Sequence, residues 1–143
     1  MDRADALDRY ARWMTTLSPQ SLAELHALAA PHMVFRDPFV EIEGPQAVID
    51  LFARMFKTLK GVRFEIHDRA LGTDNAFLAW TFHCKLKPFG PKLAIEGVSR
   101  IGFDGTGRVT RHIDDWDASQ QLYGKVPLLG PALRRVQARW IAG

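Results

Sequence analysis

The chain has few of the features that indicate a function directly. It contains one cysteine, Cys84, among 143 residues, which excludes an internal disulfide and is typical of a reducing cytoplasm. Its longest apolar runs are far shorter than the roughly 20 residues of a membrane span. The first residues carry acids and no apolar core, so they do not resemble a secretory signal. We therefore expect a cytoplasmic protein without a membrane segment.

Motifs for metals, nucleotides and catalytic nucleophiles are also missing. The histidines and Cys84 lack the close spacing of metal ligands. There is no glycine-rich phosphate loop and no Gly-x-Ser-x-Gly turn, so we expect neither a metal nor a cofactor. The formal net charge is only +3. Its basic excess lies at Arg134, Arg135 and Arg139, which we interpret as a solvated helix face and not as a nucleic-acid site.

The composition of the chain is typical of one ordinary globular domain, which we expect to cover residues 1–143. Hydrophobic residues make up 47% of the chain and charged residues 24%, enough apolar material for a core without disulfides. No linker, repeat or low-complexity tract divides the sequence. Residues 118–143 form a C-terminal extension, with a predicted helix at Ala132–Ile141.

Helical periodicity dominates the first sixty residues. Asp2 can cap a first helix whose apolar stripe includes Tyr10, so this tyrosine points inward. Ser18-Pro19 predicts the start of a second helix, with serine as the cap, and Pro31 predicts its end. Gly44-Pro45 opens a third, and Gly61 is expected to end it.

Strands follow with a period of two. Val62, Phe64 and Ile66 alternate with charged residues, which is typical of a half-buried strand. The other predicted strands are Met33–Arg36, Ala76–Lys87, Leu93–Phe103 and Arg108–Trp116. The order α-α-β-α-β-β-β-β predicts an α+β architecture in which a curved antiparallel sheet wraps around the N-terminal helices.

Four short segments accompany this order of elements. They are Phe35-Arg36-Asp37-Pro38-Phe39, Gly44-Pro45-Gln46-Ala47-Val48, Phe103-Asp104-Gly105-Thr106-Gly107-Arg108-Val109 and His112-Ile113-Asp114-Asp115-Trp116-Asp117. Together with the order of elements, they resemble the nuclear transport factor 2-like superfamily, and most closely its SnoaL-like and ketosteroid-isomerase-like branches. The resemblance covers about residues 5 to 120. It implies a cone-shaped fold with an apolar pocket at one end, and a homodimer formed through the outer sheet face.

The ketosteroid isomerase branch implies specific roles for three residues. The acid of its Asp-Pro-Phe segment is the general base, which corresponds to Asp37. An inward tyrosine on its first helix stabilises the oxyanion, and Tyr10 is the best match. Its second oxyanion donor is a protonated aspartate, and Ser99 stands at that position. Because serine cannot be that neutral acid, steroid isomerisation itself is not expected.

Other branches carry a catalytic acid on the last strand. Alternation from Trp116 places Asp114 and His112 on one face, where both can enter the pocket. The epoxide hydrolases also need a second aspartate on the preceding strand, which has Arg100 but no aspartate. The predicted catalytic residues are therefore Asp37, Asp114, His112 and Tyr10. The predicted ligand-binding residues are Phe35, Phe39, Phe52, Met55, Ser99 and Trp116.

Two functions remain open from the sequence. The first is a cofactor-free isomerase or lyase in which an aspartate removes a proton from a small, mostly apolar molecule. A carboxylate in an apolar pocket gains basicity through desolvation, which suits that task. The second is a non-catalytic ligand-binding or dimerisation module. In that case Asp37 caps a turn or pairs with an arginine, and His112 and Asp114 form a structural pair.

Overall fold

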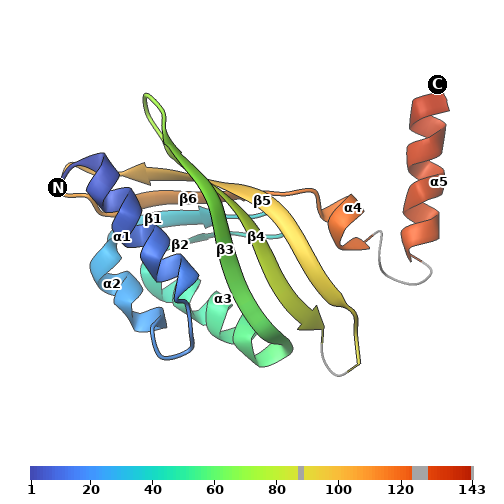
Figure 1. Cartoon of the computed structure of the whole chain (residues 1–143), viewed down its shortest axis with the longest axis horizontal. Helices are drawn as coiled ribbons and strands as arrows, with labels where there is room; N and C mark the ends of the chain where they lie inside the picture. Colours follow the sequence, from blue (N-terminus) through green and yellow to red (C-terminus); the bar gives the residue numbers. More distant parts are fainter. Residues whose placement is uncertain (87–88, 124–128, 143) are drawn as a thin grey trace.

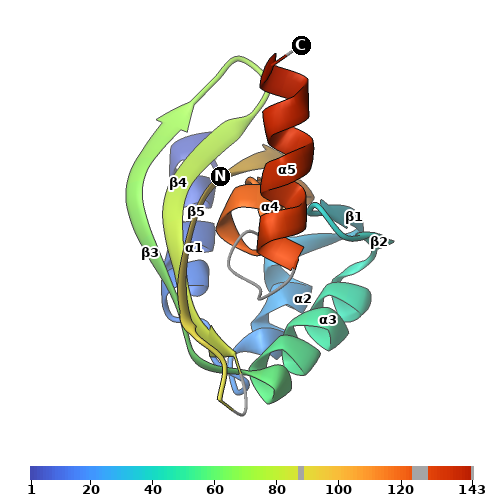
Figure 2. The ribbon, with the colours of Figure 1, turned by 90° about the vertical axis from the view of Figure 1, so that its right-hand side faces the viewer.

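The computed structural model describes residues 1–86, 89–123 and 129–142. A curved six-stranded sheet, which does not close into a barrel, wraps around the N-terminal helices (Figures 1 and 2). The strands are β1 (Ala29–Arg36), β2 (Glu41–Glu43), β3 (Leu59–Leu71), β4 (Ala76–Leu86), β5 (Lys92–Phe103) and β6 (Val109–Asp115). The helices are α1 (Arg3–Thr15), α2 (Leu25–Leu28), α3 (Pro45–Thr58), α4 (Ala118–Gln121) and α5 (Leu129–Ala142), with a 3₁₀ turn η1 (Leu22–Glu24). The predicted fold class is confirmed.

The sheet has the strand order β2-β1-β6-β5-β4-β3. All neighbours are antiparallel except β1 and β6, which run parallel. A parallel pair needs a long connection between its strands, and here α3 and four strands lie between β1 and β6 in the chain. This pairing brings the end of β1 beside the end of β6, although their sequences are far apart.

The first helix forms as the sequence predicts. The Asp2 side chain caps α1 by accepting the Asp5 N–H at 2.8 Å. Leu7, Tyr10 and Met14 on its apolar stripe are buried. Figure 2 shows α1 inside the curve of the sheet, so its stripe packs into the interior.

The second helix differs from the prediction. In place of a helix that starts at Ser18, the chain forms the short η1 and then the four-residue α2. The reason is local, because the hydroxyls of Ser18 and Ser21 accept each other's backbone N–H groups at 3.3 and 2.9 Å and close a turn. Pro31, which was expected to end this helix, lies within β1, where the register with β6 shifts.

Gly61 was expected to end the third helix, but α3 ends at Thr58 and Gly61 lies in β3. Its φ of +62° coincides with a shift in the β3–β4 register between Lys60 and Arg63. Glycine adopts this left-handed conformation without strain. The sequence also gave no signal for β2, whose three residues pair with β1.

The long strands alternate as predicted, with the large residues of β4 divided between the two faces. Leu78 and Trp80 are buried toward the helices, and Thr81 lies on the opposite face. The predicted end of this strand at Lys87 lies outside the described residues. The expected C-terminal helix is confirmed as part of α5, while α4 was not predicted. No helix in the described part of the chain is long and apolar enough to span a membrane.

Candidate functional site

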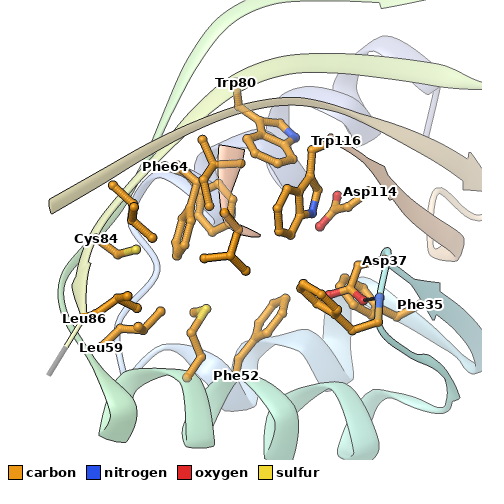
Figure 3. A pocket seen from close by; sticks show the side chains of 16 residues that line it. Phe35, Asp37, Phe52, Leu59, Phe64, Trp80, Cys84, Leu86, Asp114 and Trp116 are labelled. Atoms are coloured by element: carbon orange, nitrogen blue, oxygen red, sulfur yellow. Dashed lines mark hydrogen bonds between the residues drawn. The ribbon is translucent and has the colours of Figure 1, made fainter. Parts of the chain in front are cut away.

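A cavity of about 210 Å³ lies between the inner face of the sheet and α3 (Figure 3). Its wall is aromatic or aliphatic, with one thiol at Cys84 and two acids, Asp37 and Asp114. Both acids lie at one end, and Leu59, Cys84 and Leu86 lie at the other. The cavity therefore combines a long apolar wall with a polar end.

The sequence-predicted site residues divide into two groups. Seven of them line the cavity: Phe35, Asp37, Phe39, Phe52, Met55, Asp114 and Trp116. Tyr10, His112 and Ser99 are fully buried and lie behind Asp114, away from the cavity surface. The structure thus brings all ten into one region and gives them different positions relative to a ligand.

Alternation along β4 and β5 builds the apolar wall. Trp80, Phe82 and Cys84 occupy successive inward positions of β4. Trp80 pairs with Gly97 of β5, where an added Cβ would lie 2.5 Å from the indole ring. A glycine at this position leaves the space that the large indole occupies.

Asp114 is anchored through a single oxygen. Its Oδ1 accepts hydrogen bonds from Ser99 Oγ at 2.5 Å and from His112 Nε2 at 2.6 Å. Its side chain is 11% exposed. Both hydrogen bonds that described residues donate to this carboxylate reach Oδ1, which leaves Oδ2 to interact with a molecule in the cavity.

His112 connects Asp114 to the first helix. The Tyr10 hydroxyl lies 2.6 Å from His112 Nδ1, and both side chains are buried. A phenol donates to Nδ1, so the ring proton sits on Nε2 and is donated to Asp114. Burial and then the negative charge of Asp114 raise the pKa of Tyr10 well above its ordinary value, so the phenol keeps the proton that fixes this tautomer.

Ser99 is oriented in the same way from the other side. Trp80 Nε1 donates to Ser99 Oγ at 2.8 Å, and the one hydroxyl proton of Ser99 is directed at Asp114. Two donor chains, one from Tyr10 and one from Trp80, therefore meet at Oδ1 of Asp114. Such connected buried networks hold their members in one arrangement.

Asp37 is held by the backbone of its own turn. Its Oδ1 accepts the N–H groups of Phe39 and Val40 at 2.8 and 2.9 Å, and its own N–H donates to Val40 O at 3.0 Å. This geometry is the turn-capping role that the sequence left open for Asp37. The same residue also lines the cavity, so the two roles coexist.

Aromatic rings surround the cavity beside these acids. Phe39 is 49% exposed and meets Trp116 edge-on, with ring centroids 5.5 Å apart. It also meets Tyr123, with centroids 6.0 Å apart. Leu122, next to Tyr123, lines the cavity itself. The C-terminal extension therefore contributes to the wall.

The sequence did not identify several wall residues as part of the site. Phe64, Trp80, Phe82, Leu93 and Ile95 line the cavity, and their alternation on the strands is the signal that could have found them. Nothing in the sequence indicated Leu122. Among the described residues, no group of three or more histidine, cysteine, aspartate or glutamate side chains is arranged to hold a metal ion.

The curved sheet and the enclosed helices match the fold of solved nuclear transport factor 2-like proteins. Residues 10–112 match the SnoaL-like domain family, and the chain belongs to that family. Comparison with curated proteins gave no match.

Solved structures agree on the fold. A protein with a ketosteroid isomerase-like fold from Catenulispora acidiphila DSM 44928, in complex with trimethylamine, is 15% identical, with a TM-score of 0.71 over 87% of this chain and 93% of its own. A proposed SnoaL-like polyketide cyclase from Shewanella putrefaciens CN-32 is 20% identical, with a TM-score of 0.71 over 85% of this chain and 95% of its own. An LEH-like epoxide hydrolase from M. tuberculosis is 19% identical, with a TM-score of 0.67 over 99% of this chain and 98% of its own.

Proposed function

We propose that this SnoaL-like domain binds a small, mostly apolar molecule in the cavity and moves a proton on it, with Asp114 as the general base. The observation that carries the proposal is the anchoring of Asp114 through Oδ1, with Oδ2 left for a ligand in an otherwise apolar space. An apolar cavity of about 150 Å³ binds benzene. The 210 Å³ found here therefore suits a molecule of one or two rings.

The chemistry follows from what Asp114 can do. A carboxylate oxygen in an apolar cavity can take a proton from the carbon beside a carbonyl group, which leaves an enolate. Return of the proton at another carbon makes the reaction an isomerisation, and loss of a β-substituent makes it an elimination. His112 and Ser99 are positioning residues in this scheme, because they touch the base and not the ligand.

The enolate oxygen needs a donor, and Trp116 is placed to supply one. Its indole nitrogen lies on the side of the cavity where Asp114 lies (Figure 3). Tyr10, which the family resemblance suggests for this task, donates instead to His112. Asp37 provides a second carboxylate at the same end, where it can bind a polar substituent of the ligand.

The test is hydrogen exchange on small ketones. The protein is incubated in D₂O with cyclohexanone or 2-tetralone, and loss of the proton signals beside the carbonyl is followed by NMR. We expect the wild type to accelerate the exchange and Asp114→Asn to lower the rate by about 10²- to 10⁴-fold, the usual contribution of a general base.

Asp115→Asn is the matched control, because Asp115 is the next residue on β6 but is exposed and pairs with Arg100 at 2.8 Å. It should retain the wild-type rate. If Asp114→Asn and Asp115→Asn exchange ketones equally fast, Asp114 is not the base. If the wild type gives no acceleration with any ketone of this size that binds, the catalytic part of the proposal fails.

A second candidate is a non-catalytic module that binds a small ammonium ion. The Catenulispora acidiphila neighbour is in complex with trimethylamine. In this chain two carboxylates lie among aromatic rings, a combination that attracts organic cations. Calorimetry with trimethylammonium distinguishes the candidates. Tight binding that Asp114→Asn abolishes, without any ketone exchange by the wild type, favours the binding module.

We also infer that two copies associate through the outer face of the sheet. Exposed Val98 and its pairing partner Ala79 lie on that face, away from the cavity, and small or apolar residues suit close contact between two sheets. Light scattering after size-exclusion chromatography should give twice the mass of the chain. Val98→Lys should reduce that mass toward the 16.1 kDa of one chain.

A further inference from the structure

The segment 117–123, which contains α4, covers part of the cavity. Leu122 lines the cavity, and Tyr123 packs against Phe39 at its rim. Figure 2 shows α4 between β1 and β2 on one side and β4 and β5 on the other. This segment follows β6 and lies beyond residues 10–112, which match the SnoaL-like family.

The Gln121 side chain connects this segment to β5. The last β5–β6 pair is Val98 with Asp115, so β6 has ended beside Glu96. There the Gln121 amide takes the place of a strand residue. Its Oε1 accepts the Glu96 N–H at 2.6 Å, and its Nε2 donates to Glu96 O at 2.9 Å. A primary amide carries the same donor and acceptor as a peptide group, so it satisfies both backbone groups.

The helix α4 is too short to hold its position by itself. It has four residues, and isolated helices shorter than about 12 residues are marginal in water. Asp117 caps it by accepting Gln120 N–H at 3.1 Å and the Ser119 hydroxyl at 2.9 Å. These bonds stay within the segment, whereas those of Gln121 reach the sheet. The position of Leu122 over the cavity therefore depends on Gln121.

We propose that segment 117–123 is a lid that limits the size of the molecule the cavity accepts, with Leu122 as the limiting side chain and Gln121 as the residue that positions it. The inference rests on the proposed ligand binding in the cavity and adds a determinant of specificity to it. Small ligands fit beneath the closed lid. Larger ligands need the space that Leu122 occupies. Leu122 can move away from the cavity only after the two hydrogen bonds between Gln121 and Glu96 have broken.

The anchoring is tested first, without any ligand. Gln121→Met keeps the length of the side chain and removes both bonds, and Gln120→Met makes the same change at an exposed neighbour. Amide hydrogen exchange of Glu96, read by NMR, should be about tenfold or more faster in Gln121→Met, as expected for the loss of a protecting hydrogen bond, and unchanged in Gln120→Met. Equal exchange rates in the wild type and Gln121→Met would overturn the role of Gln121.

Size selection is tested with two neutral probes, toluene and the larger N-phenyl-1-naphthylamine. Gln121→Met and Leu122→Ala should raise the affinity for the larger probe relative to toluene by about tenfold, equivalent to about 1.4 kcal/mol. Gln120→Met should keep the wild-type ratio. Global destabilisation lowers the affinity for both probes and does not change this ratio, so the ratio reports on the lid.

The outcomes separate the two proposals. If toluene binds the wild type and the probe ratio is the same in all variants, the lid is wrong and ligand binding in the cavity stands. If Phe52→Ala and Leu122→Ala leave the binding of both probes unchanged, the probes bind elsewhere, and the cavity proposal fails together with the lid. A tenfold change in ratio confined to Gln121→Met and Leu122→Ala supports both.

Discussion

Two carboxylates line one cavity, and they are held in opposite ways. Asp37 stands in the turn after β1 and is bound by N–H groups of its own turn. Asp114 stands on β6 and is bound by the side chains of His112 and Ser99, which Tyr10 and Trp80 orient in turn. Asp37 stabilises a local piece of backbone, whereas Asp114 depends on three distant elements.

This difference is the reason why we propose Asp114, and not Asp37, as the general base. A turn needs its capping oxygen for folding, and the sequence around Asp37 explains that requirement without any ligand. The network around Asp114 contains more hydrogen-bonding side chains than a β-strand needs, and its last two donors, Ser99 and His112, both reach one carboxylate oxygen. Positioning of that kind is what a reactive group requires from its neighbours.

The largest expected effect compares the two acids directly. Asp114→Asn should lower ketone exchange by about 10²- to 10⁴-fold, while Asp37→Asn should lower it far less, because an asparagine oxygen still accepts the turn N–H groups. Exchange rates measured by NMR on both variants decide the comparison. A larger loss for Asp37→Asn would reverse the assignment of the base and restore the role that the family resemblance implies for Asp37.

The next effect concerns the hydrogen bonds that position Asp114. Tyr10→Phe removes the donor to buried His112 Nδ1, and an unsatisfied buried polar group costs about 1–3 kcal/mol. Urea unfolding should show this loss in the free energy of unfolding. Tyr123→Phe is the control, since the Tyr123 hydroxyl bonds to no residue in the described part of the chain. Equal stabilities of the two variants would contradict the network.

The same tyrosine predicts a pH dependence. Burial and the charge of Asp114 raise the pKa of Tyr10 in the folded state, so folding favours the protonated phenol. This contribution is complete below the ordinary tyrosine pKa of about 10 and is lost as the pH rises above it toward the folded value. Thermal midpoints between pH 8 and 11.5 should fall at the alkaline end, and less steeply in Tyr10→Phe.

The smallest expected effect is that of replacing Asp104, a carboxylate outside the cavity. Asp104 caps the β5–β6 turn by accepting bonds from Thr106 Oγ1 at 2.6 Å and from Arg108 N–H at 3.0 Å. The Thr106 hydroxyl first, and then the Arg108 N–H, lower the pKa of Asp104. Its contribution is therefore present above the ordinary aspartate pKa and is lost as the pH falls below it.

We expect Asp104→Ala to lower the thermal midpoint slightly at pH 7 and to differ less from the wild type near pH 3. Ketone exchange should be unaffected, because Asp104 does not line the cavity. Asp37→Ala should lower the midpoint in a similar way, since it also loses a turn cap. If Asp104→Ala also lost ketone exchange, the stability of the turns, and not the carboxylates in the cavity, would determine the rate of ketone exchange.

Local sequence patterns predicted most of the elements and failed where side chains competed with them. The cap at Asp2 and the alternation of β4 formed as expected, because both depend on neighbours in the sequence. The helix expected at Ser18 did not form, since the paired hydroxyls of Ser18 and Ser21 close a turn instead. The sequence predicts that Gly61 ends the third helix, but the pairing of β3 with β4 places it in a strand.

The sequence by itself determined the α+β class, the family and the inward direction of Tyr10, His112 and Asp114, since periodicity and short motifs are local properties. The tertiary structure decided what these residues do to one another. The β5–β6 register brings Ser99 opposite Asp114, and the position of α1 inside the sheet brings Tyr10 to His112. Contacts between residues about a hundred positions apart depend on how the sheet curves around the helices, which no local pattern specifies.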